Sequence, residues 1–102
     1  MPTRRVVFSP EAEAQLVALY RYIALNASPI IARRFSEAIL ARCEALDQMQ
    51  RQGTPRDDLR PGLRTLSFHR RVVIAYAVDK ATVTIIGIFY GGQNWETLVQ
   101  DD

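Results

Sequence analysis

The fold is decided by residues 63–90, which read LRTLSFHRRVVIAYAVDKATVTIIGIFY. Three runs rich in β-branched and aromatic residues, 63–68, 72–78 and 82–90, are separated by short polar segments. Connections this short join neighbouring antiparallel strands. The run 72–78 is apolar throughout, which is typical of a central strand covered on both faces. We therefore predict that the three runs form an antiparallel meander.

Two helices are predicted before the meander. Ser9-Pro10 and Ser28-Pro29 are both helix start signals, because serine caps the first free N–H groups and proline suits the first helical position. The first helix should run to about Asn26, and the second should end near Gly53. A connection of about two residues between them forces an antiparallel helical hairpin.

The inward faces of both helices are predicted from helical spacing. In the first helix the inward positions are Ala12, Leu16, Leu19, Tyr20 and Ile23, with Gln15 elsewhere. In the second helix they are Phe35, Ala38, Ile39, Arg42, Leu46 and Met49. A hairpin with such apolar faces needs a sheet to cover it.

The remaining segments complete a single domain. Residues 4–8 predict an opening strand, whose neighbours in the sheet are not readable from the sequence. Residues 54–62 are predicted to be a polar loop, and residues 96–102 a short tail. No repeat or long linker interrupts the 102 residues. The predicted fold is one α+β domain over residues 1–102, β-α-α-β-β-β, with an antiparallel helical hairpin packed on a small, mostly antiparallel sheet.

The composition argues against a metal, a cofactor or a place in a membrane. Cys43 is the only cysteine and His69 the only histidine, which excludes a disulfide within the chain and paired Cys or His ligands. We expect Cys43 to be a small buried side chain and His69 an exposed turn residue. No glycine-rich phosphate-binding motif, signal-peptide core or run of about 20 apolar residues occurs. We therefore predict a cytoplasmic protein without a cofactor or a small-molecule substrate.

Arginine dominates the charge pattern. The chain has 13 basic and 11 acidic residues, for a net charge of +2, and Lys80 is the only basic residue that is not an arginine. Between residues 51 and 71, six arginines occur with only two aspartates, which predicts a positive face. A guanidinium suits carboxylates and phosphates. Solvated arginines without a partner explain the pattern equally well.

Residues 91–95, Gly-Gly-Gln-Asn-Trp, follow the last strand and contain the only tryptophan. The segment is either a turn whose Trp95 packs on the core or a contact loop, since a large aromatic beside amides suits protein and nucleic-acid interfaces. Tyr22 and Tyr90 are the aromatic residues expected to turn a polar edge outward.

Five strings, spread over nearly the whole chain, carry a family resemblance. They are Val7-Phe8-Ser9-Pro10-Glu11-Ala12, Ala32-Arg33-Arg34-Phe35, Gly62-Leu63-Arg64-Thr65-Leu66, Val73-Ile74-Ala75-Tyr76 and Ile88-Phe89-Tyr90-Gly91-Gly92. In this order and spacing, the chain resembles the RelE/ParE superfamily of bacterial toxins, and its ParE branch in particular. The resemblance implies the toxin of a type II toxin–antitoxin module for plasmid or chromosomal maintenance. Such a toxin inhibits DNA gyrase, blocks replication and is neutralised by a ParD-like antitoxin.

The ribonuclease branch of this superfamily depends on side chains that are missing here. RelE-like relatives cut messenger RNA on the ribosome, with an arginine shortly after the last-strand glycine and a tyrosine or histidine near the C terminus. No arginine, tyrosine or histidine follows Tyr90 in this chain. Because amides do not exchange protons, we expect a toxin that is not an enzyme. Tyr90 with Arg64, Arg70 or Arg71 could replace the missing set, so RNA cleavage stays an alternative. A small nucleic-acid-binding module is a third interpretation, and direct nucleic-acid binding stays open.

The resemblance also suggests where partners bind. The antitoxin is expected to use an acidic, apolar segment that folds on binding across the helical hairpin and the sheet edge. Its expected contacts are Arg64, Arg70 and Arg71, with Arg33 and Arg34 as a second possibility. The expected contacts of the gyrase target are Trp95 as the anchor, with Gln93 and Asn94 beside it.

Overall fold

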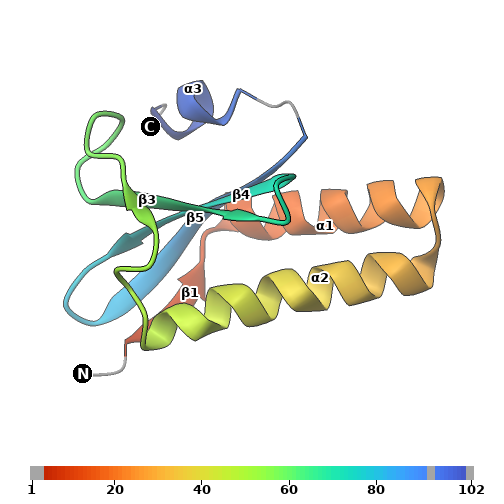
Figure 1. The fold of residues 1–102 in the computed structure, drawn as a ribbon, viewed down its shortest axis with the longest axis horizontal. Coiled ribbons are helices and arrows are strands. Elements are labelled where there is room, and N and C mark those ends of the chain that lie inside the picture. The colour runs from red at the N-terminus through yellow and green to blue at the C-terminus, as the bar shows by residue number, and fades with distance from the viewer. Residues whose placement is uncertain (1–3, 92–93, 101–102) are drawn as a thin grey trace.

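Residues 4–91 and 94–100, which the computed structural model describes, form a helical hairpin on one face of a five-stranded sheet and a short helix on the other (Figure 1). The elements are β1 (Arg5–Phe8), α1 (Pro10–Asn26), α2 (Pro29–Glu44), a 3-10 turn (Ala45–Asp47), β2 (Thr54–Pro55), β3 (Leu63–Phe68), β4 (Val72–Val78), β5 (Thr82–Tyr90) and α3 (Trp95–Gln100). The predicted α+β fold is confirmed.

Both helices of the hairpin are capped as predicted. The Ala12 N–H donates to Ser9 Oγ over 3.0 Å, and the Ile31 N–H donates to Ser28 Oγ over 3.1 Å. Each serine thus satisfies an N–H group that its helix leaves open. Ala27 and Ser28 alone connect α1 to α2. The two helices therefore run antiparallel, and their connecting end projects beyond the sheet (Figure 1).

The second helix ends earlier than predicted. α2 stops at Glu44 and one 3-10 turn follows, whereas the predicted end near Gly53 was wrong. The Asp47 carbonyl accepts hydrogen bonds from the Arg4 N–H, at 3.1 Å, and from the Gln50 side chain. A continuing helix would need this carbonyl for its own ladder. The contact with the start of β1 therefore coincides with the end of the helical region.

The hairpin buries one face of α2 against the sheet. The buried positions of this helix are Ala32, Ser36, Ile39 and Cys43. Their spacing follows the 3.6-residue helical turn. The inward positions predicted for Ala38 and Met49 were wrong, since Ala38 is exposed and Met49, beyond the helix end, is 52% exposed. Tyr20 of α1 is also exposed, because it lies at the margin of the buried stripe.

The sheet has the strand order β1-β5-β4-β3-β2. β3, β4 and β5 form the predicted antiparallel meander, with β4 in the middle. β1 pairs parallel with β5, from Arg5 opposite Thr82 to Phe8 opposite Ile85. β2 adds two residues to the edge of β3, inside a segment predicted to be a loop. The sheet is therefore mostly antiparallel, with one parallel pair at its edge.

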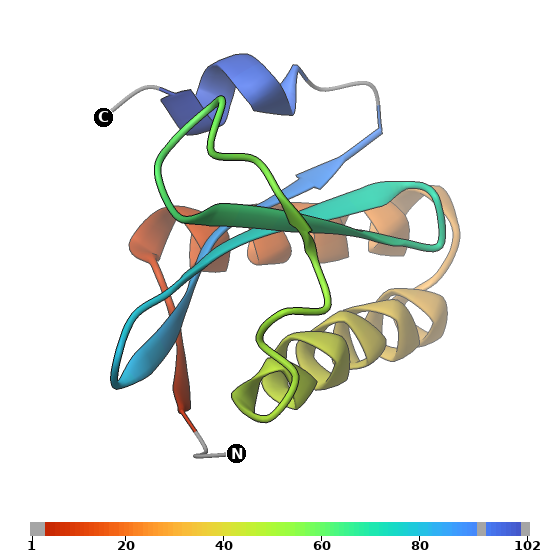
Figure 2. The same ribbon diagram turned by 60° about the vertical axis from the view of Figure 1, so that its left-hand side comes forward.

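Residues 96–100, predicted to belong to a tail, form α3 together with Trp95, on the face of the sheet opposite the hairpin (Figure 2). Val99 is buried there and packs with Leu63, Ala75 and Phe89 from the three strands of the meander. On the hairpin side, Ile74 of β4 is equally buried. β4 thus lies between two apolar layers, which explains why its sequence is apolar throughout.

A β-bulge interrupts β5 at Ile86. Ala75 of β4 pairs with Gly87, but the next residue, Tyr76, pairs with Ile85, so Ile86 has no partner in the described register of β4. The bulge changes the alternation of the side chains along β5. Ile85 therefore belongs to the hairpin-side core, whereas the strand after the bulge also covers the α3 side.

Helix α1 is bonded to β5 just after the bulge. The Ile88 N–H donates to Gln15 Oε1 over 2.7 Å, so the polar Gln15 side chain binds the strand instead of facing only solvent. Gly87 has no room for a side chain, because a Cβ atom there would overlap the ring of Phe89. The glycine therefore lets the Phe89 ring fold back over the strand.

Candidate partner-binding surfaces

The turn between β3 and β4 holds two residues in the left-handed region of backbone space. His69 has a φ of 52° and Arg70 a φ of 62°, and the Arg71 N–H donates to the Phe68 carbonyl over 3.3 Å. Glycine and asparagine are the usual residues there, and another residue costs about 1 kcal/mol or more. His69, Arg70 and Arg71 are exposed. The prediction that His69 is an exposed turn residue is confirmed.

Aromatic side chains from both helices pack beside this turn. The rings of Phe68 and His69 lie edge to face with centroids 4.3 Å apart, and Phe35 of α2 lies 5.6 Å from Phe68. On the neighbouring strand, the ring of Tyr90 lies 5.7 Å from that of Tyr22 in α1, and Tyr22 is exposed. We call this region the turn surface and define it by His69, Arg70, Arg71, Tyr22 and Tyr90.

Arg64 lies apart from the turn surface. It is near the start of β3, and about 13 Å of extended strand separates it from Phe68 at the other end. Its Nη1 donates to the Gly53 carbonyl over 2.7 Å, which ties the segment before β2 to the sheet. The structure therefore divides the predicted antitoxin contacts, since Arg70 and Arg71 share the turn and Arg64 does not reach it.

Arg33 and Arg34 are exposed on the first turns of α2, near the connecting end of the hairpin. Arg33 Nε lies 3.7 Å from Glu37, an ion pair that solvent keeps weak. A pocket of about 450 Å³ beside them is lined in part by Tyr20 and Ile30. We call this region the hairpin-tip surface and define it by Arg33, Arg34, Tyr20, Leu25, Ile30 and Ile31. Its apolar members include Leu25, which is 87% exposed.

Arg56 fastens α3 to the loop before β3. Its guanidinium lies 5.3 Å from the centroid of the Trp95 ring and 2.9 Å from a carboxylate oxygen of both Asp58 and Glu96. Hydrogen bonds from Arg56 hold the pKa of Asp58 below its ordinary value. Trp95 is half-buried and packs on the α3-side core, which agrees with the packing interpretation of this residue.

The predicted target contacts Gln93, Asn94 and Trp95 follow β5 in the sequence, and Trp95 is the first residue of α3. Asn94 is exposed, and its carbonyl accepts a hydrogen bond from the Leu98 N–H over 3.3 Å. Gln93 lies outside the described residues. The target-binding role of these three residues stays a prediction. To contact the whole face of the Trp95 ring, a target would have to displace the Arg56 side chain.

Two buried titratable groups have structural roles. Burial raises the pKa of the Cys43 thiol to about 12, which keeps it protonated, and the prediction of a small buried side chain is confirmed. The Tyr76 hydroxyl donates to the Gln50 carbonyl and accepts from the Gly53 N–H, each over 2.8 Å, and burial raises its pKa.

In residues 4–91 and 94–100, no group of three His, Cys, Asp or Glu side chains is placed to hold a metal ion. No helix in this part of the chain has the length and apolar character to cross a membrane.

The family of the chain follows from a match over most of its length. Residues 6–95 match the family described as "ParE toxin of type II toxin-antitoxin system, parDE". The chain belongs to the ParE toxin family. The matched region includes the hairpin and all of the sheet except Arg5 of this ParE-family toxin, but only the first residue of α3.

A solved structure has the same fold as this ParE-family toxin. It is described as the chromosomal ParDE TA system from P. aeruginosa. Its TM-score is 0.77 at 24% sequence identity, over 89% of this chain and 99% of that chain. No curated protein matches the chain in sequence. The structural comparison thus supports the fold, and the family match shows the family to which the chain belongs.

Proposed function

We propose that this ParE-family toxin inhibits DNA gyrase in the cytoplasm and blocks replication by binding rather than by catalysis. A ParD-like antitoxin neutralises it. The observation that supports this proposal most is the ParE family match over residues 6–95. The shared fold with a protein from a ParDE system also supports a toxin–antitoxin pair.

The placement of ionisable side chains separates part of the alternative catalytic set. Cleavage of RNA needs an acid and a base within reach of one phosphate. Arg64 and Tyr90, two members of the possible substitute set, lie toward opposite ends of the meander. After Tyr90, the ionisable side chain in residues 94–99 is Glu96, and it is bonded to Arg56. Arg70 and Arg71, the other members of that set, do share the turn surface with Tyr90, so RNA cleavage by these residues stays an alternative that the experiment below tests.

Two surfaces have the chemistry to bind an acidic, apolar antitoxin segment. The hairpin-tip surface combines Arg33 and Arg34 with exposed aliphatic side chains. The turn surface combines Arg70 and Arg71 with aromatic rings. Pairing of guanidinium groups with carboxylates would guide association, and burial of the apolar side chains would supply affinity.

The experiment that tests the proposal is controlled expression of the chain in a bacterium, with growth, cell shape and messenger RNA followed together. Filamentation with a DNA-damage response and intact messenger RNA is the expected result. The purified protein should then inhibit DNA supercoiling by purified gyrase. Codon-specific cuts in messenger RNA would contradict the proposal and favour the ribonuclease interpretation. Normal growth would contradict a toxic role in that host.

Two further measurements separate the remaining alternatives. Co-expression of the reading frame next to the gene should restore growth if its product is the antitoxin. Binding of free DNA or RNA, measured over a range of salt, addresses the nucleic-acid-binding module. Tight binding whose logarithm falls steeply with the logarithm of salt concentration would favour that module over a protein-directed toxin.

A further inference from the structure

A small hollow opens beside the two tyrosines of the turn surface. Its volume is about 200 Å³, and it is lined by Gln15, Ala18, Leu19, Tyr22, Ile88 and Tyr90. The ring planes of Tyr22 and Tyr90 are tilted by 54°, so the two rings do not cover each other face to face. Pockets that enclose a drug-sized ligand measure about 300–1,000 Å³. The hollow therefore suits one flat ring of a larger partner.

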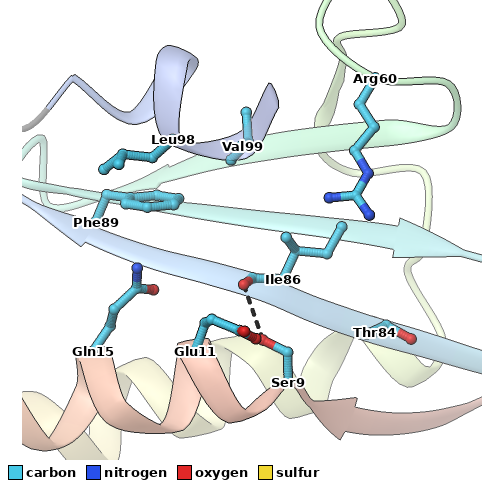
Figure 3. A pocket seen from close by; sticks show the side chains of 9 residues that line it. All are labelled: Ser9, Glu11, Gln15, Arg60, Thr84, Ile86, Phe89, Leu98 and Val99. Atoms are coloured by element: carbon cyan, nitrogen blue, oxygen red, sulfur yellow. Dashed lines mark hydrogen bonds between the residues drawn. The ribbon is translucent and has the colours of Figure 1, made fainter. Parts of the chain in front are cut away.

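The lining of this hollow has the groups that bind a nucleobase. Tyr22 is 53% exposed, which leaves part of its ring open to stacking. Gln15 points from α1 toward β5 (Figure 3), where its Oε1 accepts from the Ile88 N–H over 2.7 Å. The NH₂ group of the same amide donates no hydrogen bond to the described residues. An aromatic face with an amide donor beside it matches the face and the polar edge of a base.

The arginines of the turn start next to the Tyr90 wall of the hollow. The N–H of Gly91, which follows Tyr90, donates to the Arg71 carbonyl over 3.0 Å. Arg70 and Arg71 are exposed, and neither side chain forms a hydrogen bond or an ion pair with the described residues. Arg64 differs, because its guanidinium is bonded to the Gly53 carbonyl. The two guanidinium groups of the turn are therefore available to phosphates.

A larger hollow, which Gln15 also lines, is less suited to a polyanion. It measures about 420 Å³, and its lining includes Glu11 as well as Arg60 (Figure 3). The Glu11 carboxylate would repel a phosphate bound by Arg60. No acidic residue lines the smaller hollow or occurs in residues 69–71. The charge pattern therefore favours the smaller hollow and the adjoining turn.

We propose that the turn surface binds a single-stranded segment of DNA, with one unstacked base in the hollow against Tyr22 and the neighbouring phosphates on Arg70 and Arg71. A single strand is required, because a base inside a duplex is covered by its neighbours. The inference rests on the proposed function only for the choice of DNA over RNA, since DNA is what gyrase supercoils. It gives the turn surface a ligand other than the antitoxin.

The test measures fluorescence anisotropy of a labelled thymidine oligomer of about ten nucleotides with the purified chain. We expect a dissociation constant of about 10⁻⁴–10⁻⁶ M, which is typical of non-specific electrostatic contacts. The logarithm of affinity should fall against the logarithm of salt concentration with a slope of about −1.4, since each of two phosphate contacts contributes about −0.7 on a single strand. This weak, shallow dependence differs from that of a dedicated nucleic-acid-binding module.

Variants at exposed positions separate the two kinds of contact. The double variant Arg70→Gln, Arg71→Gln should bind at least about tenfold more weakly and lose most of the salt dependence. Tyr22→Ala should bind about fivefold or more weakly with an unchanged slope, because it removes only the stacking face. Two controls should stay within about twofold of the parent. They are Tyr22→Phe, which keeps the ring, and Arg51→Gln, which removes an exposed guanidinium outside the turn surface.

A parallel assay of DNA supercoiling by gyrase separates this inference from the proposed function. Inhibition of gyrase by a chain that binds no single-stranded DNA would overturn the assignment and leave the proposed function intact. DNA binding with the expected variant effects, but without inhibition, would support the site and contradict the proposed function. Absence of both would contradict both. Equal affinity for a duplex of the same length, or tighter binding of the matching RNA, would also overturn the assignment.

Discussion

Two single residues adopt backbone angles that are unfavourable for their residue types. His69 and Arg70 both occupy the left-handed region, although neither is a glycine or an asparagine. Each of these positions carries a cost in the folded state. The turn keeps a ring and two guanidinium groups exposed at that cost.

Replacement of Arg70 by glycine should therefore stabilise the fold. We expect a gain of up to about 1 kcal/mol in the free energy of unfolding, since glycine adopts a positive φ without steric strain. Urea denaturation measures this gain. Arg71→Gly is the matched control, because Arg71 is exposed in the same turn without a positive φ and should lose stability from added chain freedom. Equal losses of unfolding free energy in both variants would show that the positive φ of Arg70 carries no strain.

Removal of the Tyr76 hydroxyl should destabilise the fold more than removal of an exposed hydroxyl. Tyr76→Phe leaves the Gly53 N–H and the Gln50 carbonyl without their buried partner. We expect a loss of about 1–3 kcal/mol in unfolding free energy. Tyr22→Phe changes the same atom on an exposed ring and should stay within about 0.5 kcal/mol of the parent. A similar result for the two variants would show that solvent replaces the buried bonds.

At the scale of elements, α3 depends on contacts with a distant loop. Arg56→Ala removes the cation from the Trp95 ring and from Glu96. We expect faster amide exchange in residues 95–100, a shift of the tryptophan fluorescence and a lower free energy of unfolding. Arg51→Ala, an exposed arginine outside this cluster, is the control. Unchanged exchange in Arg56→Ala would mean that burial of Val99 alone holds the helix.

Elements with local signals were predicted well. Ser9 and Ser28 mark the two helix starts through bonds within three residues, and the strands of the meander carry the pattern of their own burial. The end of α2 and the existence of α3 were missed because they depend on contacts far apart in sequence. The Asp47 carbonyl meets Arg4, and Arg56 meets Trp95 and Glu96.

The candidate site was predictable in chemistry but less so in geometry. An excess of arginine between residues 51 and 71 was visible in the sequence. Its distribution in space was not, because the side chains of Arg64 and Arg56 are used within the molecule whereas Arg70 is exposed. The end of β1 opposite Ile85 and the bulge at Ile86 both depend on pairing between strands that are distant in sequence. Neither has a local sequence signal beyond Gly87.

For the whole molecule, acid should weaken the fold through two carboxyl groups. Hydrogen bonds from Arg56 lower the pKa of Asp58, and those from the Thr82 and Ala81 N–H groups lower the pKa of Asp79. A carboxyl group whose pKa is lower in the folded state stabilises the fold above its unfolded pKa of about 3.9. That contribution is lost as the pH falls through the folded pKa.

Thermal unfolding from about pH 6 down to about pH 2.5 measures this loss, because the scan crosses the unfolded pKa of about 3.9 and continues into more acidic solution. Below about pH 4 the melting temperature should fall less steeply in the double variant Asp58→Asn, Asp79→Asn than in the parent chain. At about pH 6 the double variant should already be the less stable of the two, because it lacks both contributions. Parallel curves over the whole range would assign the acid sensitivity to other groups.

The parallel pairing of β1 with β5 also bears on when the toxin becomes harmful. Arg5 pairs with Thr82, so β1, which is synthesised first, cannot pair until β5 has been synthesised near the end of the chain. Contacts this distant in sequence slow folding and place completion of the sheet after most of the polypeptide has left the ribosome. Premature termination before β5 therefore leaves a nascent chain without the strand that joins β1 to the rest of the sheet. Each newly made molecule also passes through an interval in which an antitoxin already present can meet it before it is fully folded.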